Sequence, residues 1–311
     1  MTYDITIKKV AIAGASGQIG QAILKELLKS ELFEITILTR DSTTYQTLFA
    51  PAIKIIQVDY SSLDSLTQAV TDQDAVISTI SPRAIPVQKL LIDACIQAHV
   101  HRFIPSEYSY DFCNPLIQKH ITHHPIFAQK LAIETYLQDQ TTSTTTLSYT
   151  LLYSNPILEP SLQKNTFFHF PTHSATLTPS SKTHPISLTT LPSLSKAIRR
   201  ILTHPRETAN RPIRIKDIDV THYQLLSIAE SLTPDQEWDI QEEEFKEEKE
   251  ETTKDAITST PNNERNFNFG GNFEKVHNCI FGIKEMTLTE LEDLMRVTFS
   301  GMEKEQGKES S

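Results

Sequence analysis

The first half of the chain alternates short apolar runs with amphipathic stretches, which is the pattern of strands alternating with helices. Strands are predicted at residues 8–13, 33–38, 54–58, 74–79, 101–104 and 147–152. Helices are predicted at residues 18–30, 62–71, 86–98 and 125–138. Because strands that alternate with helices pair in parallel through right-handed crossovers, this half predicts an α/β domain built on a doubly wound parallel sheet.

From about residue 156 the pattern changes, because proline and threonine become frequent. Here the apolar spacing predicts helices at 191–202, 223–232 and 288–299 and a short strand at 213–215, and a loop is predicted at 258–265. The Glu- and Lys-rich stretch 239–254 is predicted to be either a solvated helix or a mobile loop. We therefore expect a first domain over residues 1–155, a smaller substrate-binding lobe over 156–300 to which both parts of the chain can contribute strands, and a disordered tail over 301–311.

The junction of the first strand and helix reads VAIAGASGQIGQAILKELL, with glycines at 14, 17 and 20. In a turn that binds a dinucleotide pyrophosphate, Gly14 permits the tight turn, Gly17 lets the backbone approach the phosphates, and Gly20 lets the helix pack on the strand. The N–H groups at the start of the helix then face the negative charge, and we expect Ser16, Gln18 and Ile19 to contribute to this site. A tight turn without a ligand is the alternative.

The second strand ends at Thr39, Arg40 and Asp41, about twenty residues beyond the last glycine of the turn. At this place an NAD site offers a carboxylate to the ribose 2′-hydroxyl, and an NADP site offers a cation to the 2′-phosphate. The guanidinium of Arg40 suits a phosphate, which favours NADP(H), whereas Asp41 could take the hydroxyl of NAD. A solvated Arg40–Asp41 pair is the third possibility.

Composition excludes several classes of protein. A formal net charge of −10 over 311 residues argues against a nucleic-acid surface. The three cysteines are far apart and match neither a disulfide framework nor zinc spacing, which fits a reducing compartment. The first residues lack an apolar signal core, and no run of about 18 apolar residues predicts a membrane span. We therefore expect a cytoplasmic protein with no membrane or nucleic-acid partner.

Two further strand ends offer small polar side chains. The segment QKLLIDACIQAHVHRFIPSEYSYD leads from a helix through the fifth strand to Pro105, Ser106 and Glu107, and the fourth strand ends in STISP, which contains Ser81. Because the carboxyl ends of parallel strands form the ligand crevice, we expect Ser81 and Ser106 to contact the cofactor. Ordinary turn chemistry is the alternative.

The helix in HPIFAQKLAIETYL contains Lys130, a candidate proton donor or acceptor. A tyrosine four residues earlier would complete an acid–base pair, but that residue is Ile126. A lone lysine would need burial and nearby positive charge to exchange a proton near neutral pH, and a surface lysine is the alternative. The nearby His120, His123 and His124 lack obvious carboxylate or cysteine partners, so we expect a solvated loop and no metal.

With these residues in view, the chain resembles the NmrA-like and isoflavone reductase-like family of atypical short-chain dehydrogenases over roughly residues 5–300. The matching segments are GASGQIG, TRD, LLIDACIQAHVHRFIPSEYSYD, FAQKLAIETYL, TTLPSLSKAIRRILTHP and FEKVHNCIFG. The third of these, with its RFIPSE strand end, is the most specific. FAQKLAIETYL corresponds to the family's lysine helix and places Lys130 at the catalytic lysine.

The resemblance implies a Rossmann-type sheet with a smaller C-terminal α+β lobe, and NADPH-dependent reduction of a small phenolic or aromatic substrate by a monomer or homodimer. Lys130 would be catalytic and would also contact the cofactor, and we expect Asn155, Pro156 and Phe168 at the substrate. The chain departs from the family where Asn155 and Pro156 replace a glycine and an aromatic residue, and where Ser109 or Tyr110 replaces a glycine. The rival hypothesis is an NAD(P)-sensing regulator, as in NmrA-type relatives, that acts through a protein partner without catalysis.

Overall fold

A computed structural model describes residues 6–42, 53–115, 117–118, 124–143, 146–178, 182–242 and 271–309. The chain forms two compact units, which are described separately. Unit 1 comprises residues 1–154, 191–215 and 276–282, and unit 2 comprises residues 155–190, 216–275 and 283–311. The chain therefore passes from one unit to the other several times.

The sheet of unit 1 is parallel throughout and has the strand order β3-β2-β1-β4-β5-β6-β9. Its strands are β1 (Lys9–Ala13), β2 (Glu34–Thr39), β3 (Ile53–Gln57), β4 (Ala75–Ser78), β5 (Arg102–Ile104), β6 (Ser148–Tyr153) and β9 (Arg211–Arg214). Its helices are α1 (Gln18–Ser30), α3 (Leu63–Val70), η1 (Pro82–Val87), α4 (Gln88–Gln97), α6 (Pro125–Ser143), α8 (Leu191–Thr203) and α10 (Asn278–Phe281).

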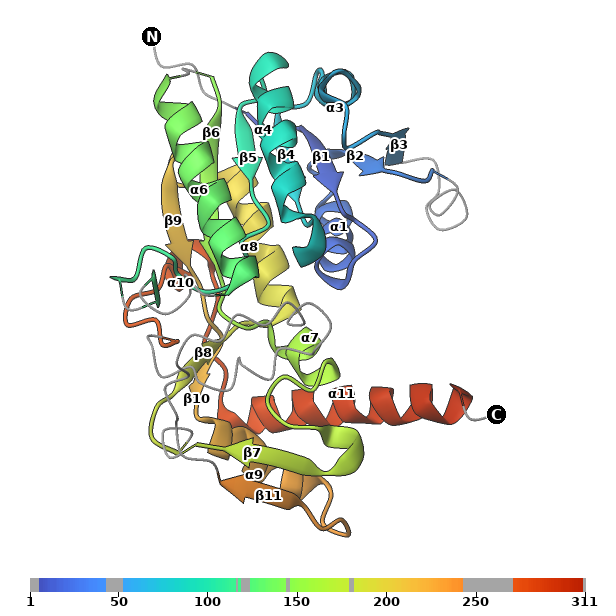
Figure 1. Cartoon of the computed structure of the whole chain (residues 1–311), viewed down its shortest axis with the longest axis vertical. Helices are drawn as coiled ribbons and strands as arrows, with labels where there is room; N and C mark the ends of the chain where they lie inside the picture. The colour runs from blue at the N-terminus through green and yellow to red at the C-terminus, as the bar shows by residue number, and fades with distance from the viewer. Residues whose placement is uncertain are drawn as a thin grey trace. The chain divides into compact units, whose positions relative to one another are not determined.

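Strand order reverses beside β1, which pairs with β2 on one side and with β4 on the other. Helix α1 packs against α8, whereas α4 contacts both α3 and α6 (Figure 1). Because crossovers between parallel strands are right-handed as a rule, the reversal is expected to put these two groups of helices on opposite faces of the sheet. The resulting doubly wound α/β sheet confirms the predicted fold class, and its switch point lies at the carboxyl ends of β1 and β4.

The apolar spacing in the sequence accounts for these elements. Helix α1 buries Ile23, Leu24 and Leu27, which recur at the helical period, and β1 is buried from its second residue onward. Helix α3 is capped by Ser62, whose side chain accepts a hydrogen bond from the backbone N–H of Ser65 at 3.2 Å. The predicted strands of the first half are all present, with ends shifted by about one residue.

Unit 2 is smaller and mixes short strands with helices. Its elements are α7 (Leu158–Gln163), η2 (Phe170–Thr172), β7 (Ser174–Leu177), β8 (Ile186–Leu188), β10 (Ile218–Val220), α9 (His222–Leu232), β11 (Asp239–Glu242) and α11 (Leu288–Glu309). Strand β8 pairs antiparallel with β10, and β7 pairs parallel with β11. Phe168, Phe170, Trp238 and Phe299 pack together in its core, so aromatic side chains hold these short elements in place.

Three predictions about the second half need correction. A contiguous lobe from residue 156 is wrong, because α8 packs on α1 and β9 pairs with β6 in the sheet of unit 1. The disordered tail is wrong for residues 301–309, because α11 continues to Glu309. Residues 239–242 form strand β11, while the rest of the stretch to 254 and the loop predicted at 258–265 lie outside the described residues.

Candidate functional site

The glycine turn after β1 separates into two structural glycines and one that is not needed for packing. Gly14 has φ +86°, and a Cβ built on it would lie 2.6 Å from the backbone oxygen of Thr79. A Cβ on Gly20 would lie 2.5 Å from the oxygen of Gly14, whereas one on Gly17 would meet nothing closer than that oxygen at 3.7 Å. Gly14 and Gly20 are therefore required by the fold, and the space beside Gly17 fits a ligand that approaches the backbone.

The first turn of α1 has the properties of an anion site. Its N-cap, Gly17, makes no side-chain cap, and the first turn contains no acidic residue. The N–H groups of a helix's first turn have no acceptor within the helix and lie at the positive end of its dipole. Ser16 and Gln18 are exposed beside them, and the side-chain amide of Gln21 donates to the backbone oxygen of Ser16 at 2.8 Å. These groups fit the pyrophosphate of a dinucleotide.

Arg40 follows β2 as an exposed side chain and forms no ion pair with any residue that the structure describes. The hydroxyl of Thr39 accepts a hydrogen bond from the backbone N–H of Asp41 at 3.2 Å and donates one to the backbone oxygen of Asp41 at 2.9 Å. These two bonds fix the turn around Arg40. An exposed guanidinium at this strand end fits a 2′-phosphate.

Hydrogen bonds connect the carboxyl ends of β1, β4 and β5. The hydroxyl of Thr79 donates to the oxygen of Ala13 at 2.9 Å, and the hydroxyl of Ser106 donates to the oxygen of Ile80 at 2.9 Å. The N–H of Ser106 donates to the side-chain oxygen of Gln88 at 2.8 Å. Ser81 is exposed at the N-cap of η1. The structure thus brings the segments of Ser81 and Ser106 to the same sheet edge as the glycine turn.

Lys130 is buried on α6, with 8% of its surface exposed. Its ammonium group donates to the backbone oxygen of Glu107 at 2.5 Å and to the hydroxyl of Ser109 at 3.0 Å. The surface-lysine alternative is therefore wrong, because Lys130 is anchored to the segment that follows β5. The hydroxyl of Ser109 is thus one of the partners of the lysine ammonium.

The charged groups around Lys130 are negative, whereas the sequence analysis required positive charge near this lysine. The carboxyl groups of Glu107 and Glu134 are buried nearby, and both interact electrostatically with Lys130. Negative charge favours the protonated lysine, so the site suits an ammonium that donates a proton. Sequence reasoning did not assign a role to Glu134, although its spacing of four residues from Lys130 places both on one side of the helix.

The histidines near α6 provide no metal site in the described residues. His120 and His123 lie outside the described part of the chain. His124 packs on Phe127 with ring centroids 4.5 Å apart, and burial lowers the pKa of its imidazole. The described residues contain no cluster of three or more side chains able to hold a metal ion. They also include no helix long and apolar enough to cross a membrane.

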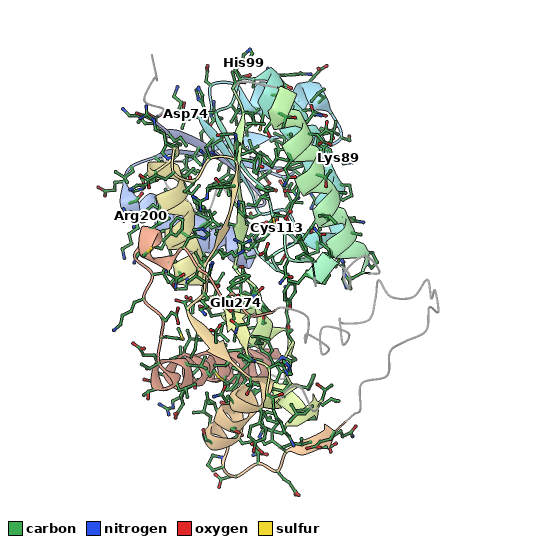
Figure 2. All side chains as sticks on the ribbon, turned by 90° about the vertical axis from the view of Figure 1, so that its left-hand side faces the viewer. Asp74, Lys89, His99, Cys113, Arg200 and Glu274 are labelled. Atoms are coloured by element: carbon green, nitrogen blue, oxygen red, sulfur yellow. The ribbon has the colours of Figure 1, made fainter. Side chains whose placement is uncertain are left out.

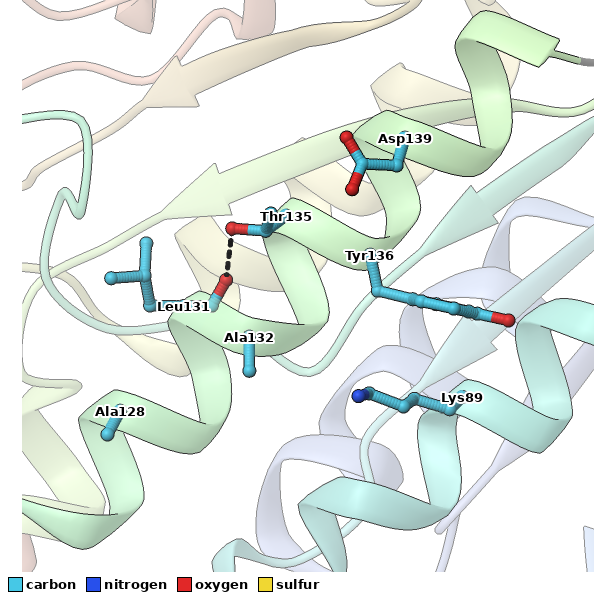
Figure 3. A pocket seen from close by; sticks show the side chains of 7 residues that line it. All are labelled: Lys89, Ala128, Leu131, Ala132, Thr135, Tyr136 and Asp139. Carbon is cyan, nitrogen blue, oxygen red and sulfur yellow. Dashed lines mark hydrogen bonds between the residues drawn. The ribbon is translucent and has the colours of Figure 1, made fainter.

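Helix α6 also borders a pocket of about 490 Å³ on its outer side (Figure 3). The pocket is lined by Lys89, Ala128, Leu131, Ala132, Thr135, Tyr136 and Asp139. The ammonium of Lys89 lies 5.3 Å from the centre of the Tyr136 ring, and the Tyr136 hydroxyl bonds Asp93 at 2.5 Å. None of the expected cofactor residues lines this pocket, so we do not assign the predicted site to it.

The expected substrate residues belong to unit 2 and have structural roles. Asn155 adopts φ +52°, and its side chain donates to the oxygen of Gly271 at 2.7 Å. Asparagine tolerates this left-handed conformation, which explains how it replaces the family's glycine. Pro156 is half-buried and accepts a hydrogen bond from Thr189. Phe168 packs edge-on against aromatic side chains, and we assign it to the core of unit 2 rather than to a substrate surface.

Comparison with known proteins identifies the class to which this fold and site belong. The model of the NmrA-like family matches residues 6–252, so the chain belongs to the NmrA-like family. It is 31% identical over 234 residues to oxidoreductase AprR of Aspergillus flavus, covering 75% of this chain and 76% of the relative.

Two solved structures have similar folds. An NADPH-dependent quinone oxidoreductase from Escherichia coli has a TM-score of 0.66 at 17% identity, covering 92% of this chain and 99% of its own. AtPrR2, solved with NADP+ and (+)-pinoresinol, has a TM-score of 0.61 at 20% identity, covering 78% of this chain and 80% of its own. At these identities the likeness concerns the fold.

Proposed function

We propose that this protein is an NADPH-dependent oxidoreductase that reduces a small phenolic or aromatic substrate, with Lys130 as the proton donor. Its family membership and its similarity to AprR, which is described as an oxidoreductase, support the class of reaction. The bound groups of AtPrR2, NADP+ and (+)-pinoresinol, support the choice of cofactor and of a phenolic substrate.

The cofactor would be held at the carboxyl edge of the sheet. The first turn of α1, with Gly14, Gly17 and Gly20 before and within it, would bind the pyrophosphate, and Arg40 would bind the 2′-phosphate. Ser81 and Ser106, at the ends of β4 and β5, would face the ribose beside the nicotinamide. When bound, NADPH supplies a hydride to the substrate.

The position of Lys130 is the observation that most strongly favours an enzyme. Its ammonium group is fixed by Glu107 and Ser109, in the segment that follows Ser106. Burial strengthens its interaction with negative charge that develops on a substrate oxygen, and an N–H of the ammonium can pass its proton to that oxygen. A regulator that only senses the cofactor would not need a buried ammonium at this strand end.

A substrate screen tests the proposal. Phenolic and aromatic carbonyl, quinone and alkene compounds would be incubated with the protein and NADPH, and consumption of NADPH would be followed by its absorbance. We expect turnover with at least one compound class, and loss of that turnover in Lys130→Ala. Saturable NADPH binding without turnover across the panel would instead support the NAD(P)-sensing regulator.

A further inference from the structure

Two buried carboxyl groups lie beside Lys130, and the proposed reaction does not yet use them. Glu107, in the segment after β5, is fully buried, and Glu134, on α6, is 2% exposed. The two carboxyl groups interact with each other, and the hydroxyl of Tyr153 donates to one oxygen of Glu134 at 2.9 Å. We call Glu107 and Glu134 the carboxyl pair.

The hydrogen bonding of the carboxyl pair requires a proton. If both groups were ionised, both oxygens of Glu107 and the second oxygen of Glu134 would have no donor among the described residues. Two adjacent negative charges without water would also repel each other strongly. One proton between the groups supplies the missing donor and removes one charge.

Burial is the main cause of the altered acidity of the carboxyl pair. It raises the pKa of Glu107 to about 7, although the charge of Lys130 and the hydrogen bond with Glu134 act in the opposite direction. Burial, followed by the charge of Glu107, raises the pKa of Glu134 well above its ordinary value. Because the two groups are coupled, the proton belongs to the pair rather than to one residue.

Other ionisable groups surround the pair on several elements. Tyr108, in the segment after β5, interacts with Glu107, whereas Cys113 in the same segment and Tyr149 and Tyr153 on β6 interact with Glu134. Asp111 in that segment and Arg214 on β9 interact with Cys113. Arg214 forms an ion pair with Asp111 at 2.6 Å. The thiol of Cys113, labelled in Figure 2, lies 3.6 Å from the Tyr153 hydroxyl, and burial raises its pKa. Lys130 interacts electrostatically with both members of the pair.

We propose that Glu107 and Glu134 share one proton at neutral pH and that their single remaining negative charge keeps Lys130 protonated and oriented for proton donation. The pair transfers no proton itself, and both glutamates are positioning residues that act through Lys130. This proposal deepens the proposed function, on which it rests for the role of Lys130. The shared proton can nevertheless be tested without any turnover.

The first experiment measures urea unfolding of the full chain from pH 5 to pH 8, comparing the unaltered protein with Glu134→Gln. Carboxyl groups in the unfolded chain lose their protons near their ordinary pKa of 4.5, whereas the folded pair keeps one. Unfolding then releases a proton, so stability is greatest at low pH and falls as pH rises until the folded pair also ionises. In Glu134→Gln the amide takes the place of the shared proton, so the contribution of Glu134 to this pH dependence is lost.

We expect the unfolding constant of the unaltered protein, divided by that of Glu134→Gln, to rise about tenfold per pH unit between pH 5 and 7. Asp139→Asn makes the same carboxyl-to-amide change at an exposed position of α6, and its ratio should stay flat with pH. A flat ratio for Glu134→Gln as well would overturn the shared proton. If Glu134→Gln does not fold, Tyr153→Phe serves instead, because it keeps both carboxyl groups of the pair. Its infrared spectrum must then contain the band of a protonated carboxyl group. Absence of this band would contradict the proposal.

The second experiment follows the charge of Lys130 by ¹⁵N NMR of lysine Nζ, with the signal assigned by its loss in Lys130→Arg. Glu134→Gln keeps one negative charge, and the double variant Glu107→Gln, Glu134→Gln removes it. We expect the ammonium to lose its proton at a pH about 1–3 units lower in the double variant than in Glu134→Gln. Equal titration in the two variants would refute the charge-setting role.

Turnover separates this proposal from the proposed function. If a substrate is found, the pH at which turnover falls on the alkaline side should move down in the double variant and not in Asp139→Asn. Absence of turnover in the unaltered protein would contradict the reductase, whereas the unfolding and NMR results would still decide the carboxyl pair.

Discussion

The glycine turn and the Lys130 site lie at the same sheet edge of unit 1, but they are assembled in different ways. The turn consists of seven consecutive residues from the end of β1 into α1, GASGQIG, in which close backbone contacts require Gly14 and Gly20 and leave open space beside Gly17. The Lys130 site combines α6, the segment after β5 and the end of β6. The glycine turn is therefore local in sequence, whereas the Lys130 site is assembled only when the chain folds.

This difference separates binding from chemistry. The turn offers helix N–H groups and an open space beside Gly17, which suit a ligand that is held by its phosphates. The Lys130 site offers a buried ammonium beside two carboxyl groups, which suits proton donation. Substitutions in the two regions should therefore affect different measured quantities.

The largest expected effect is on turnover at Lys130. Lys130→Ala should lower kcat by about 10²–10⁴-fold, because the proton donor is lost. NADPH affinity should fall far less, since the phosphates are held elsewhere. Lys130→Arg keeps the charge but cannot release a proton near neutral pH, so it should remain slow. Near-normal kcat in Lys130→Ala on a confirmed substrate would remove the lysine from the mechanism.

The glycine turn should respond in cofactor binding. Gly17 has φ −73° and ψ 162°, a conformation open to valine, and a Cβ there meets no close atom of the chain. Gly17→Val should therefore fold, with a native circular dichroism spectrum, but should lose NADPH binding because the side chain occupies the place of the pyrophosphate. The matched control is Gly20→Val, which should destabilise the fold itself. Normal NADPH binding by Gly17→Val would make the turn purely structural.

A smaller effect is expected at Arg40, which concerns the choice of cofactor. A charge-assisted bidentate contact with the 2′-phosphate should favour NADPH over NADH by about ten- to hundredfold. Arg40→Ala should reduce this preference by lowering NADPH affinity while leaving NADH affinity nearly unchanged. Parallel titrations of both cofactors would measure it. An unchanged preference would assign the selectivity to another residue.

The smallest expected effect concerns the orientation of Lys130. Ser109→Ala removes one of the two hydrogen bonds described above for the lysine ammonium, and a hydrogen bond to a charged group corresponds to about tenfold in rate at the low end of its range. We expect kcat to fall by about that factor, with KM for NADPH unchanged. A loss as large as that of Lys130→Ala would mean that Ser109 takes part in the chemistry.

The sequence correctly predicted the features that depend on residues close together in the chain. The strands and helices of the first half follow from apolar periodicity, and the glycine spacing identifies the turn. It did not indicate that α8 and β9 complete unit 1, because a change in composition near residue 156 does not report long-range pairing. It also missed the carboxyl pair, since Glu107 and Glu134 are 27 positions apart, and their burial depends on packing between β5, β6 and α6.

Calorimetric titration of the unaltered protein with NADPH, and separately with NADH, tests the central claim most directly. We predict saturable binding of NADPH at one site per chain, tighter than that of NADH by about ten- to hundredfold. Absence of saturable binding of either cofactor would contradict the assignment of the glycine turn and, with it, the proposed oxidoreductase.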